Sequence, residues 1–168
     1  GLGKGLRSES CVEKKGYLLF IGNRQVAYKR FDVAQEVAKR TGLELRTASN
    51  VTREQLNIMY NEALCLLYPS DYEGFGIPIL EAQKAGCPVI AQNTSSVPEV
   101  IGNGELLVSH DKTVRMADAM ADKVKQLLSQ PTQSIIEKGM QNAKRFSWDK
   151  TYAQTKQVYE DIYYNHHL

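Results

Sequence analysis

Residues 73–76 read EGFG, and a second glutamate, Glu81, follows eight positions after Glu73. The two glycines lie between an apolar run of strand length and a helical pattern whose first turn contains Pro78. Proline suits that turn because the N–H that it lacks would have no partner there. The remaining N–H groups of the turn, with the positive end of the helix dipole, favour a phosphate. The pattern therefore predicts an anion site; the simpler alternative is a tight turn flanked by two solvated acids.

Two basic residues, Arg24 and Lys29, follow a second apolar run and can supply the charge that a phosphate needs. Each charge-assisted hydrogen bond contributes about 1.5–3 kcal/mol, so two cations and a helix N-terminus suit a diphosphate. A carboxylate would repel phosphate, so Glu73 and Glu81 fit better as acceptors of hydrogen bonds from sugar hydroxyls. The set predicts a nucleotide-sugar site, in which the cations stabilise the charge of a departing diphosphate without a metal.

Other chemistry finds less support in the sequence. Asp71 and Glu73 have the spacing of a metal-binding acid pair, but the neighbouring cations make a metal unnecessary, and we expect none. The opening GLGKGLR has neither a preceding strand nor the Ser or Thr that follows Lys in a triphosphate loop. No nucleophile elbow and no dinucleotide fingerprint are present, and no residue is an obvious covalent nucleophile. We expect no permanently bound cofactor, only a nucleotide-diphosphate sugar as donor substrate.

Strand and helix patterns alternate along the chain before a helical tail. The runs that read as strands are residues 17–22, 43–48, 64–68, 88–91 and 105–108. The tail is expected to form helices over residues 111–129 and 132–145 and from Ser147 onward. This alternation predicts a single Rossmann-like α/β domain, with a mostly parallel sheet, helices on both faces and a helical C-terminal tail. Ligands of such sheets bind outside the carboxyl ends of the strands, where the loops at 23–29, 49–51, 69–77 and 92–96 converge.

Helix boundaries are marked by local signals. Gly42 is placed to end the helix that follows Lys29. Thr52 with Gln55 fits a capping box, and Ser96 with Glu99 fits a second one, which would give Glu99 a purely structural role. The last helix carries a set of apolar anchors: Trp148, Tyr152, Val158, Tyr159 and Ile162.

Composition limits the function classes. A chain of 168 residues is enough for one domain, and we assign residues 1–16 to a linker and 17–168 to the domain. The net charge of +2 gives no reason to expect nucleic acid, and no apolar run approaches the ~20 residues that span a bilayer. Three cysteines, Cys11, Cys65 and Cys87, read as reduced thiols of an intracellular protein.

These residues carry a family resemblance. EGFGIPILE, residues 73–81, resembles the E-x7-E motif of group 1 retaining glycosyltransferases with the GT-B fold. FIGNRQVAYKRFD is similar to that family's first strand and phosphate-binding loop, and PVIAQNTSSVPEVIGNGELLV to the segment after the motif. FSWDKTYAQTKQVYEDIY is similar to the closing helices, the last of which packs back toward a second domain. The resemblance runs from about Tyr17 to Tyr163.

The resemblance implies roles for the site residues. Arg24 and Lys29 would bind the diphosphate, Glu81 would bind the ribose, and Glu73 would contact the donor sugar near its reacting carbon. Arg24, Lys29 and Glu73 are thus the expected catalytic residues. The remaining donor-binding positions form the glycine loop, whose last three N–H groups would hold sugar hydroxyls and phosphate: Gly74, Phe75, Gly76 and Ile77.

The resemblance also implies an incomplete enzyme. GT-B glycosyltransferases have two such domains with the active site between them, and this chain has room for one. We expect the donor-binding half of a cytoplasmic enzyme that moves a sugar to a glycan or lipid-linked glycan held by the missing N-terminal domain. The isolated half would be inactive, and attachment to the inner membrane face, if any, would not come from it. Two alternatives remain open: half of a nucleotide-sugar epimerase, or a non-catalytic nucleotide-binding module. The strand order around residues 43–51 also remains open.

Overall fold

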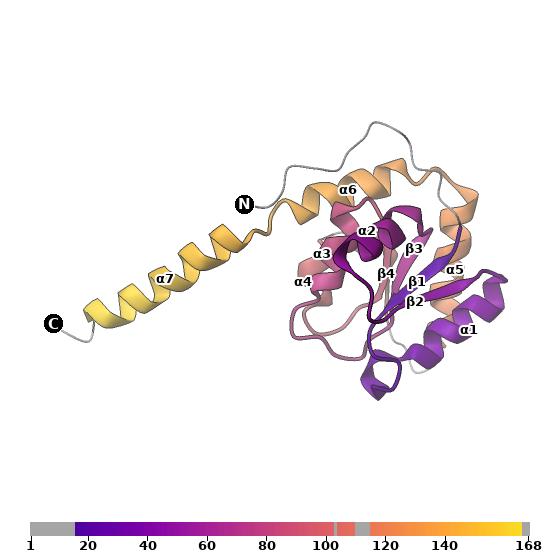
Figure 1. The fold of residues 1–168 in the computed structure, drawn as a ribbon, viewed down its shortest axis with the longest axis horizontal. Helices are drawn as coiled ribbons and strands as arrows, with labels where there is room; N and C mark the ends of the chain where they lie inside the picture. Colours follow the sequence, from indigo (N-terminus) through magenta and orange to yellow (C-terminus); the bar gives the residue numbers. More distant parts are fainter. Residues whose placement is uncertain (1–15, 103, 110–114, 166–168) are drawn as a thin grey trace.

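A five-stranded, fully parallel sheet forms the centre of the molecule (Figure 1). The computed structural model describes residues 16–102, 104–109 and 115–165. Its strands are β1 (Leu18–Ile21), β2 (Leu45–Ala48), β3 (Cys65–Tyr68), β4 (Val89–Gln92) and β5 (Leu107–Val108). Their order in the sheet is β2-β1-β3-β4-β5, which answers the question left open around residues 43–51. The predicted α/β fold with a parallel sheet is confirmed.

Helices alternate with the strands and then continue as a tail. The α-helices are α1 (Phe31–Thr41), α2 (Arg53–Glu62), α3 (Ile77–Lys84), α4 (Val97–Ile101), α5 (Met116–Ser129), α6 (Gln133–Ala143) and α7 (Trp148–Asn165). Two short 3-10 turns complete the described elements, η1 (Ala27–Lys29) and η2 (Gly104–Leu106).

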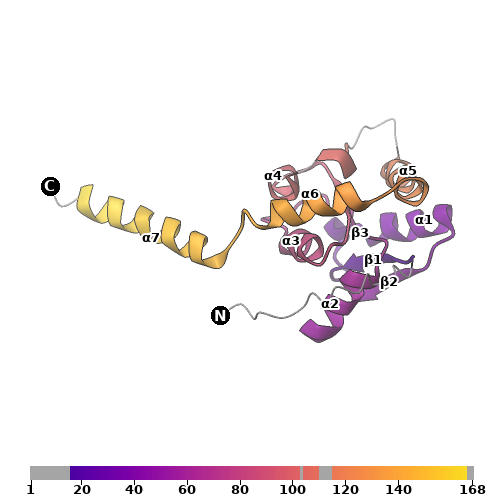
Figure 2. The same cartoon turned by 90° about the horizontal axis from the view of Figure 1, so that it is seen from above.

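Both faces of the sheet are covered because side chains of successive strand residues point to opposite faces. On β1, Leu18 and Phe20 pack with the helices α1 and α5, whereas Leu19 packs on the opposite face with α2, α3 and α4. The continuous apolar runs of β1, β3 and β4 follow from this double burial. Figure 2 shows α1 beside α5 on one side of the sheet and α6 lying along α3 on the other.

Two predicted helix ends are confirmed, and one is wrong. Gly42 ends α1 with φ +70°, and its N–H donates to the Ala38 carbonyl. Thr52 and Gln55 form both hydrogen bonds of the capping box at α2. Ser96 is the N-cap residue of α4, but the predicted capping box is absent: its side chain makes no bond to the helix and donates instead to carbonyl oxygens of the 69–76 loop. The Ser96 hydroxyl therefore bonds to the backbone of another loop and not to the first turn of α4.

Helix α7 extends away from the rest of the molecule (Figures 1 and 2). Its expected apolar anchors are all exposed, from 54% for Ile162 to 73% for Tyr159. No helix in the described ranges is long and apolar enough to cross a membrane. The start of the helix predicted at residue 111 and most of the predicted linker lie outside the described residues. Cys65 and Cys87 are buried, as expected of core thiols.

Candidate donor site

Three loops meet at the carboxyl ends of β1, β3 and β4. The loop after β1 carries Lys29, whose Nζ lies 2.7 Å from Oε1 of Glu73 in the loop after β3. The side chains of this ion pair are 20% and 10% exposed, respectively. Lys29 Nζ also lies 5.3 Å from the ring centroid of Tyr28 and 5.9 Å from that of Tyr68. The predicted cation and the predicted sugar-binding carboxylate are therefore in direct contact.

The glycine loop leads into α3 through a residue that must be glycine. Gly76 is the N-cap of α3 with φ +104°, and a Cβ there would lie 3.1 Å from the Ile79 side chain. Gly74 differs, because a Cβ at that position would meet nothing within 4 Å. The protein itself does not require glycine at Gly74, so the missing side chain leaves open space for a ligand. Pro78 lies in the first turn of α3, as predicted.

The N-terminal end of α3 keeps its hydrogen-bonding capacity. In the described part of the chain, the N–H groups of Gly74, Phe75, Gly76 and Ile77 donate to no protein acceptor. These groups lie beside the Lys29–Glu73 pair, since Glu73 directly precedes them. An unpaired helix N-terminus next to an ammonium group is suited to an anion.

Glu81 is held by a buried phenol from α2. The Tyr60 hydroxyl lies 3.1 Å from Glu81 Oε2 and 3.4 Å from the Pro78 carbonyl oxygen, and the Tyr60 side chain is 2% exposed. The Pro78 contact places the Glu81 carboxylate near the start of α3, since helical side chains lean toward the N-terminus. Burial, then the charge of Glu81, raises the pKa of Tyr60 well above its usual value. The phenol therefore stays protonated as a donor at neutral pH.

Glu73 has a similar neighbour in Tyr68, the last residue of β3. Burial raises the pKa of Tyr68, and the charge of Glu73 and a hydrogen bond to its carboxylate raise it further. Glu73 therefore faces a cation and a neutral donor, whereas Glu81 faces a neutral phenol. Both tyrosines were visible in the sequence only as apolar positions, because a phenol that packs in a core gives no separate signal.

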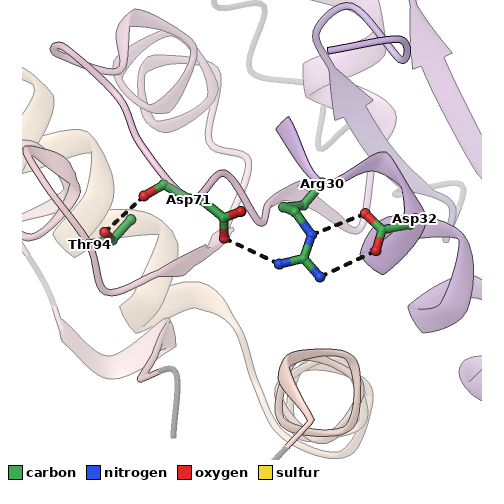
Figure 3. A network of polar contacts seen from close by, with 4 residues as sticks. All are labelled: Arg30, Asp32, Asp71 and Thr94. Atoms are coloured by element: carbon green, nitrogen blue, oxygen red, sulfur yellow. Dashed lines mark hydrogen bonds and ion pairs between the residues drawn. The ribbon is translucent and has the colours of Figure 1, made fainter. Parts of the chain in front are cut away.

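A second polar network connects the three loops (Figure 3). Arg30 lies between two carboxylates, with 3.2 Å from NH1 to Asp71 Oδ1 and 3.2 Å from Nε to Asp32 Oδ1. The Asp71 N–H donates to the Tyr28 carbonyl at 2.8 Å, and its own carbonyl accepts from the Thr94 hydroxyl at 3.1 Å. Asp71 thus joins all three loops, and its carboxylate is bound to an arginine that the sequence did not single out.

Arg24 lies apart from this cluster. It is exposed, and its guanidinium carbon lies 5.8 Å from the Phe31 ring centroid rather than at Glu73. The structure therefore brings Lys29, Glu73 and the glycine loop together and leaves Arg24 at the side of the β1 loop. Among the described residues, no cluster of three His, Cys, Asp or Glu side chains is arranged to hold a metal.

The chain matches proteins that transfer sugars. The family model described as "Glycosyl transferases group 1" matches residues 9–146. The O-antigen chain mannosyltransferase B of Escherichia coli is 35% identical over 133 residues, which cover 77% of this chain and 34% of that protein. The MMP alpha-(1->4)-mannosyltransferase of Mycolicibacterium hassiacum is 32% identical over 120 residues, covering 69% and 29%. The chain thus spans about a third of the length of these curated relatives.

Solved structures share the fold at low sequence identity. The pneumococcal O-GlcNAc transferase GtfA, in complex with UDP and GlcNAc, has a TM-score of 0.69 at 17% identity over 89% of this chain and 36% of that one. Sucrose-phosphate synthase from Thermosynechococcus elongatus has a TM-score of 0.71 at 17% identity over 90% and 46%. They confirm the predicted Rossmann-like fold, and the family match spans the glycine loop and all three loops of the site. The chain belongs to the group 1 glycosyl transferases.

Proposed function

We propose that this chain is the donor-binding half of a retaining glycosyltransferase. The observation that carries the proposal is the contact of Lys29 with Glu73 beside the unbonded N–H groups at the start of α3. The Lys29 ammonium group and these N–H groups attract a diphosphate, and the Glu73 carboxylate accepts hydrogen bonds from a sugar. The two kinds of group lie next to each other. A nucleotide-diphosphate sugar presents these two chemistries next to each other.

The proposed reaction is a sugar transfer with retention of configuration. The bond between the anomeric carbon and the diphosphate oxygen breaks, and the diphosphate leaves with the electron pair. Lys29 and Arg24 stabilise the charge on that leaving group, as does the N-terminus of α3. The acceptor oxygen forms the new bond to the anomeric carbon on the same face, and its proton passes to the departing phosphate. Glu73 binds the sugar near the reacting carbon, and Glu81 binds the ribose.

The acceptor belongs to the rest of the protein. A second domain would bind a glycan or lipid-linked glycan, and the exposed aromatic residues of α7 would pack against that domain. The isolated half then binds donor and turns nothing over. The enzyme would act in the cytoplasm or at the inner face of a membrane. An epimerase would convert a nucleotide sugar without an acceptor; the match to glycosyl transferases favours transfer.

Titration of this chain with UDP and GDP, followed by NMR, tests the proposal. Both mannosyltransferase relatives make GDP-mannose a suitable third ligand. Amide shifts should be confined to the loops after β1, β3 and β4, and Lys29→Ala should abolish them. Lys125→Ala removes an exposed lysine of α5 and should change nothing. Absence of any response from the wild-type chain would refute the proposal.

A further inference from the structure

The loop after β4 holds the glycine loop through hydroxyl groups. The Glu73 N–H donates to Ser95 Oγ at 2.9 Å. The Ser96 hydroxyl lies 2.9 Å from the Glu73 carbonyl oxygen and 3.0 Å from that of Phe75, and donates to both as a shared bond. The Thr94 hydroxyl donates to the Asp71 carbonyl at 3.1 Å. Three consecutive residues thus bind the backbone of residues 71–75.

The glycine loop has little other support. In the described part of the chain, Ser95 and Ser96 make all the hydrogen bonds that reach the backbone of residues 72–75. Tyr72 is 65% exposed and Phe75 46% exposed, although the Phe75 ring packs edge-on against Phe146 with 5.8 Å between the ring centroids. A loop held by so few contacts would sample several backbone conformations without these hydrogen bonds. The two serines therefore restrict its backbone, together with the Lys29–Glu73 ion pair and the contact of Phe75 with Phe146.

Glu73 is the residue fixed most directly. Its N–H and its carbonyl are both bound, the first to Ser95 and the second to Ser96. Fixing the peptide groups on both sides of a residue fixes the direction of its Cα–Cβ bond. The carboxylate is then aimed at Lys29 rather than into solvent. Ser95 adopts φ +46°, a left-handed conformation that a serine keeps only where its surroundings impose it.

We propose that Ser95 and Ser96 are positioning residues of the donor site, which hold Glu73 in the direction from which its carboxylate receives the donor sugar. This role rests on the proposed function. Neither serine is bonded to Lys29, whose turn is closed by the bond from its own N–H to the Val26 carbonyl. Loss of the serine hydroxyls should therefore weaken binding of the sugar part of the donor more than binding of the diphosphate part.

The test compares a nucleotide-diphosphate sugar with its nucleotide diphosphate. Dissociation constants of GDP-mannose and GDP, and of UDP-N-acetylglucosamine and UDP, are measured by calorimetry on the full 168-residue chain. Ser96→Ala removes one hydroxyl, and Ser95→Gly removes the other without adding strain at positive φ. Ser96→Thr keeps the hydroxyl and should rescue binding. Ser129→Ala removes an exposed hydroxyl at the end of α5 and is the matched control.

Each lost hydrogen bond should weaken binding of the sugar nucleotide about threefold to tenfold, with less than about twofold change for the diphosphate. Amide hydrogen exchange in the unliganded chain gives a second measurement. In Ser95→Gly, exchange of the Glu73 N–H should accelerate by a similar factor, since that amide loses its acceptor. Melting temperatures should stay close to wild type, because the loop buries little surface.

Four outcomes overturn the role. If Ser96→Ala binds the sugar nucleotide as tightly as wild type, the hydroxyl does not position the loop. If sugar nucleotide and diphosphate weaken equally, or if Ser96→Thr fails to rescue, the serine supports the fold and not the sugar site. If the wild-type chain binds none of the four ligands, the proposed function fails and the positioning role fails with it. Only the last outcome touches the proposed function.

Discussion

Replacing Lys29 by methionine and Glu73 by glutamine, singly and together, measures how much the ion pair contributes to stability and how much each charge contributes to donor binding. Methionine keeps most of the length and apolar surface of lysine, and glutamine keeps the shape of glutamate. Each single variant therefore removes one charge with little change in packing. The double variant removes both, so the four proteins form a thermodynamic cycle.

The structure sets the size of the coupling in the unliganded chain. At 2.7 Å, the attraction is about 6 kcal/mol for an effective dielectric constant of about 20. Desolvation offsets most of it, because the two side chains are only 20% and 10% exposed. A net coupling of about 1–3 kcal/mol remains, between the values for surface and buried pairs. Urea denaturation should show Lys29→Met destabilised by that amount and the double variant less so.

The two single variants should have different effects on the affinity for a nucleotide diphosphate. Lys29→Met loses a charge-assisted bond to phosphate, and the affinity for UDP or GDP should fall about 10- to 150-fold. Glu73→Gln removes a carboxylate that competes with phosphate for Lys29. Its affinity for the diphosphate should therefore stay equal or rise, while its affinity for the sugar nucleotide falls. Calorimetry with paired ligands measures both.

Two results would refute this reasoning. An unchanged diphosphate affinity in Lys29→Met would show that the ammonium group does not contact phosphate. Diphosphate affinity could also fall as much in Glu73→Gln as in Lys29→Met. That result would show that the pair acts as a structural unit, in which Lys29 does not bind the diphosphate separately from the binding of the sugar by Glu73. Lys125→Met provides the control for a general charge effect, because that lysine is exposed on α5.

The remaining predictions concern the buried polar groups. Tyr60→Phe should weaken GDP or UDP binding about threefold to tenfold by freeing Glu81, and calorimetry should show no loss for 2′,3′-dideoxy nucleotides, which lack the hydroxyls that Glu81 would bind. The raised pKa values of Tyr60 and Tyr68 leave stability unaffected below about pH 10. Above that pH the unfolded chain loses phenol protons that the native chain keeps. The free energy of unfolding from urea denaturation should therefore fall by up to about 1.4 kcal/mol per pH unit for each phenol, and by less in Tyr→Phe variants. Asn142→Ala leaves one buried oxygen on α3 and one on α4 without a donor and should cost about 2–3 kcal/mol in urea denaturation, whereas exposed Gln141→Ala should cost little.

The sequence predicted the parts of the fold whose signals are local. Apolar runs predicted strands at β1, β3 and β4, and those strands occupy the centre of the sheet. The runs at residues 43–48 and 105–108 also predicted strands, and these lie at the two edges as β2 and β5. The second is shorter than predicted, because Gly104–Leu106 form a 3-10 turn. The capping box at Thr52 was recognisable because both of its bonds join residues three apart. In each case, the residues that give the signal lie within one short segment.

Signals with distant partners were missed or misassigned. Ser96 followed by Glu99 has the spacing of a capping box, but its hydroxyl binds residues more than twenty positions earlier in the chain. Arg30 gave no signal, since its contact with Asp71 exists only because two loops meet at neighbouring strand ends. Sheet order could not be read from spacing for the same reason. Long-range pairing is decided by packing of the whole domain and not by any one segment.

The two glutamates of the glycine loop and α3 have different surroundings, and this favours two separate binding roles over an acid–base pair. An acid–base pair needs one carboxyl that stays protonated, and such a group sits in an apolar pocket or beside a like charge. Glu73 contacts the Lys29 ammonium group, and Glu81 accepts a hydrogen bond from the Tyr60 phenol, so the two carboxylates have separate polar partners. They can bind hydroxyls at two places along one ligand, with the cation and the helix N-terminus between them for its phosphates. The contacts of each carboxylate, rather than their spacing in the sequence, therefore favour a nucleotide sugar over a substrate hydrolysed by acid–base catalysis.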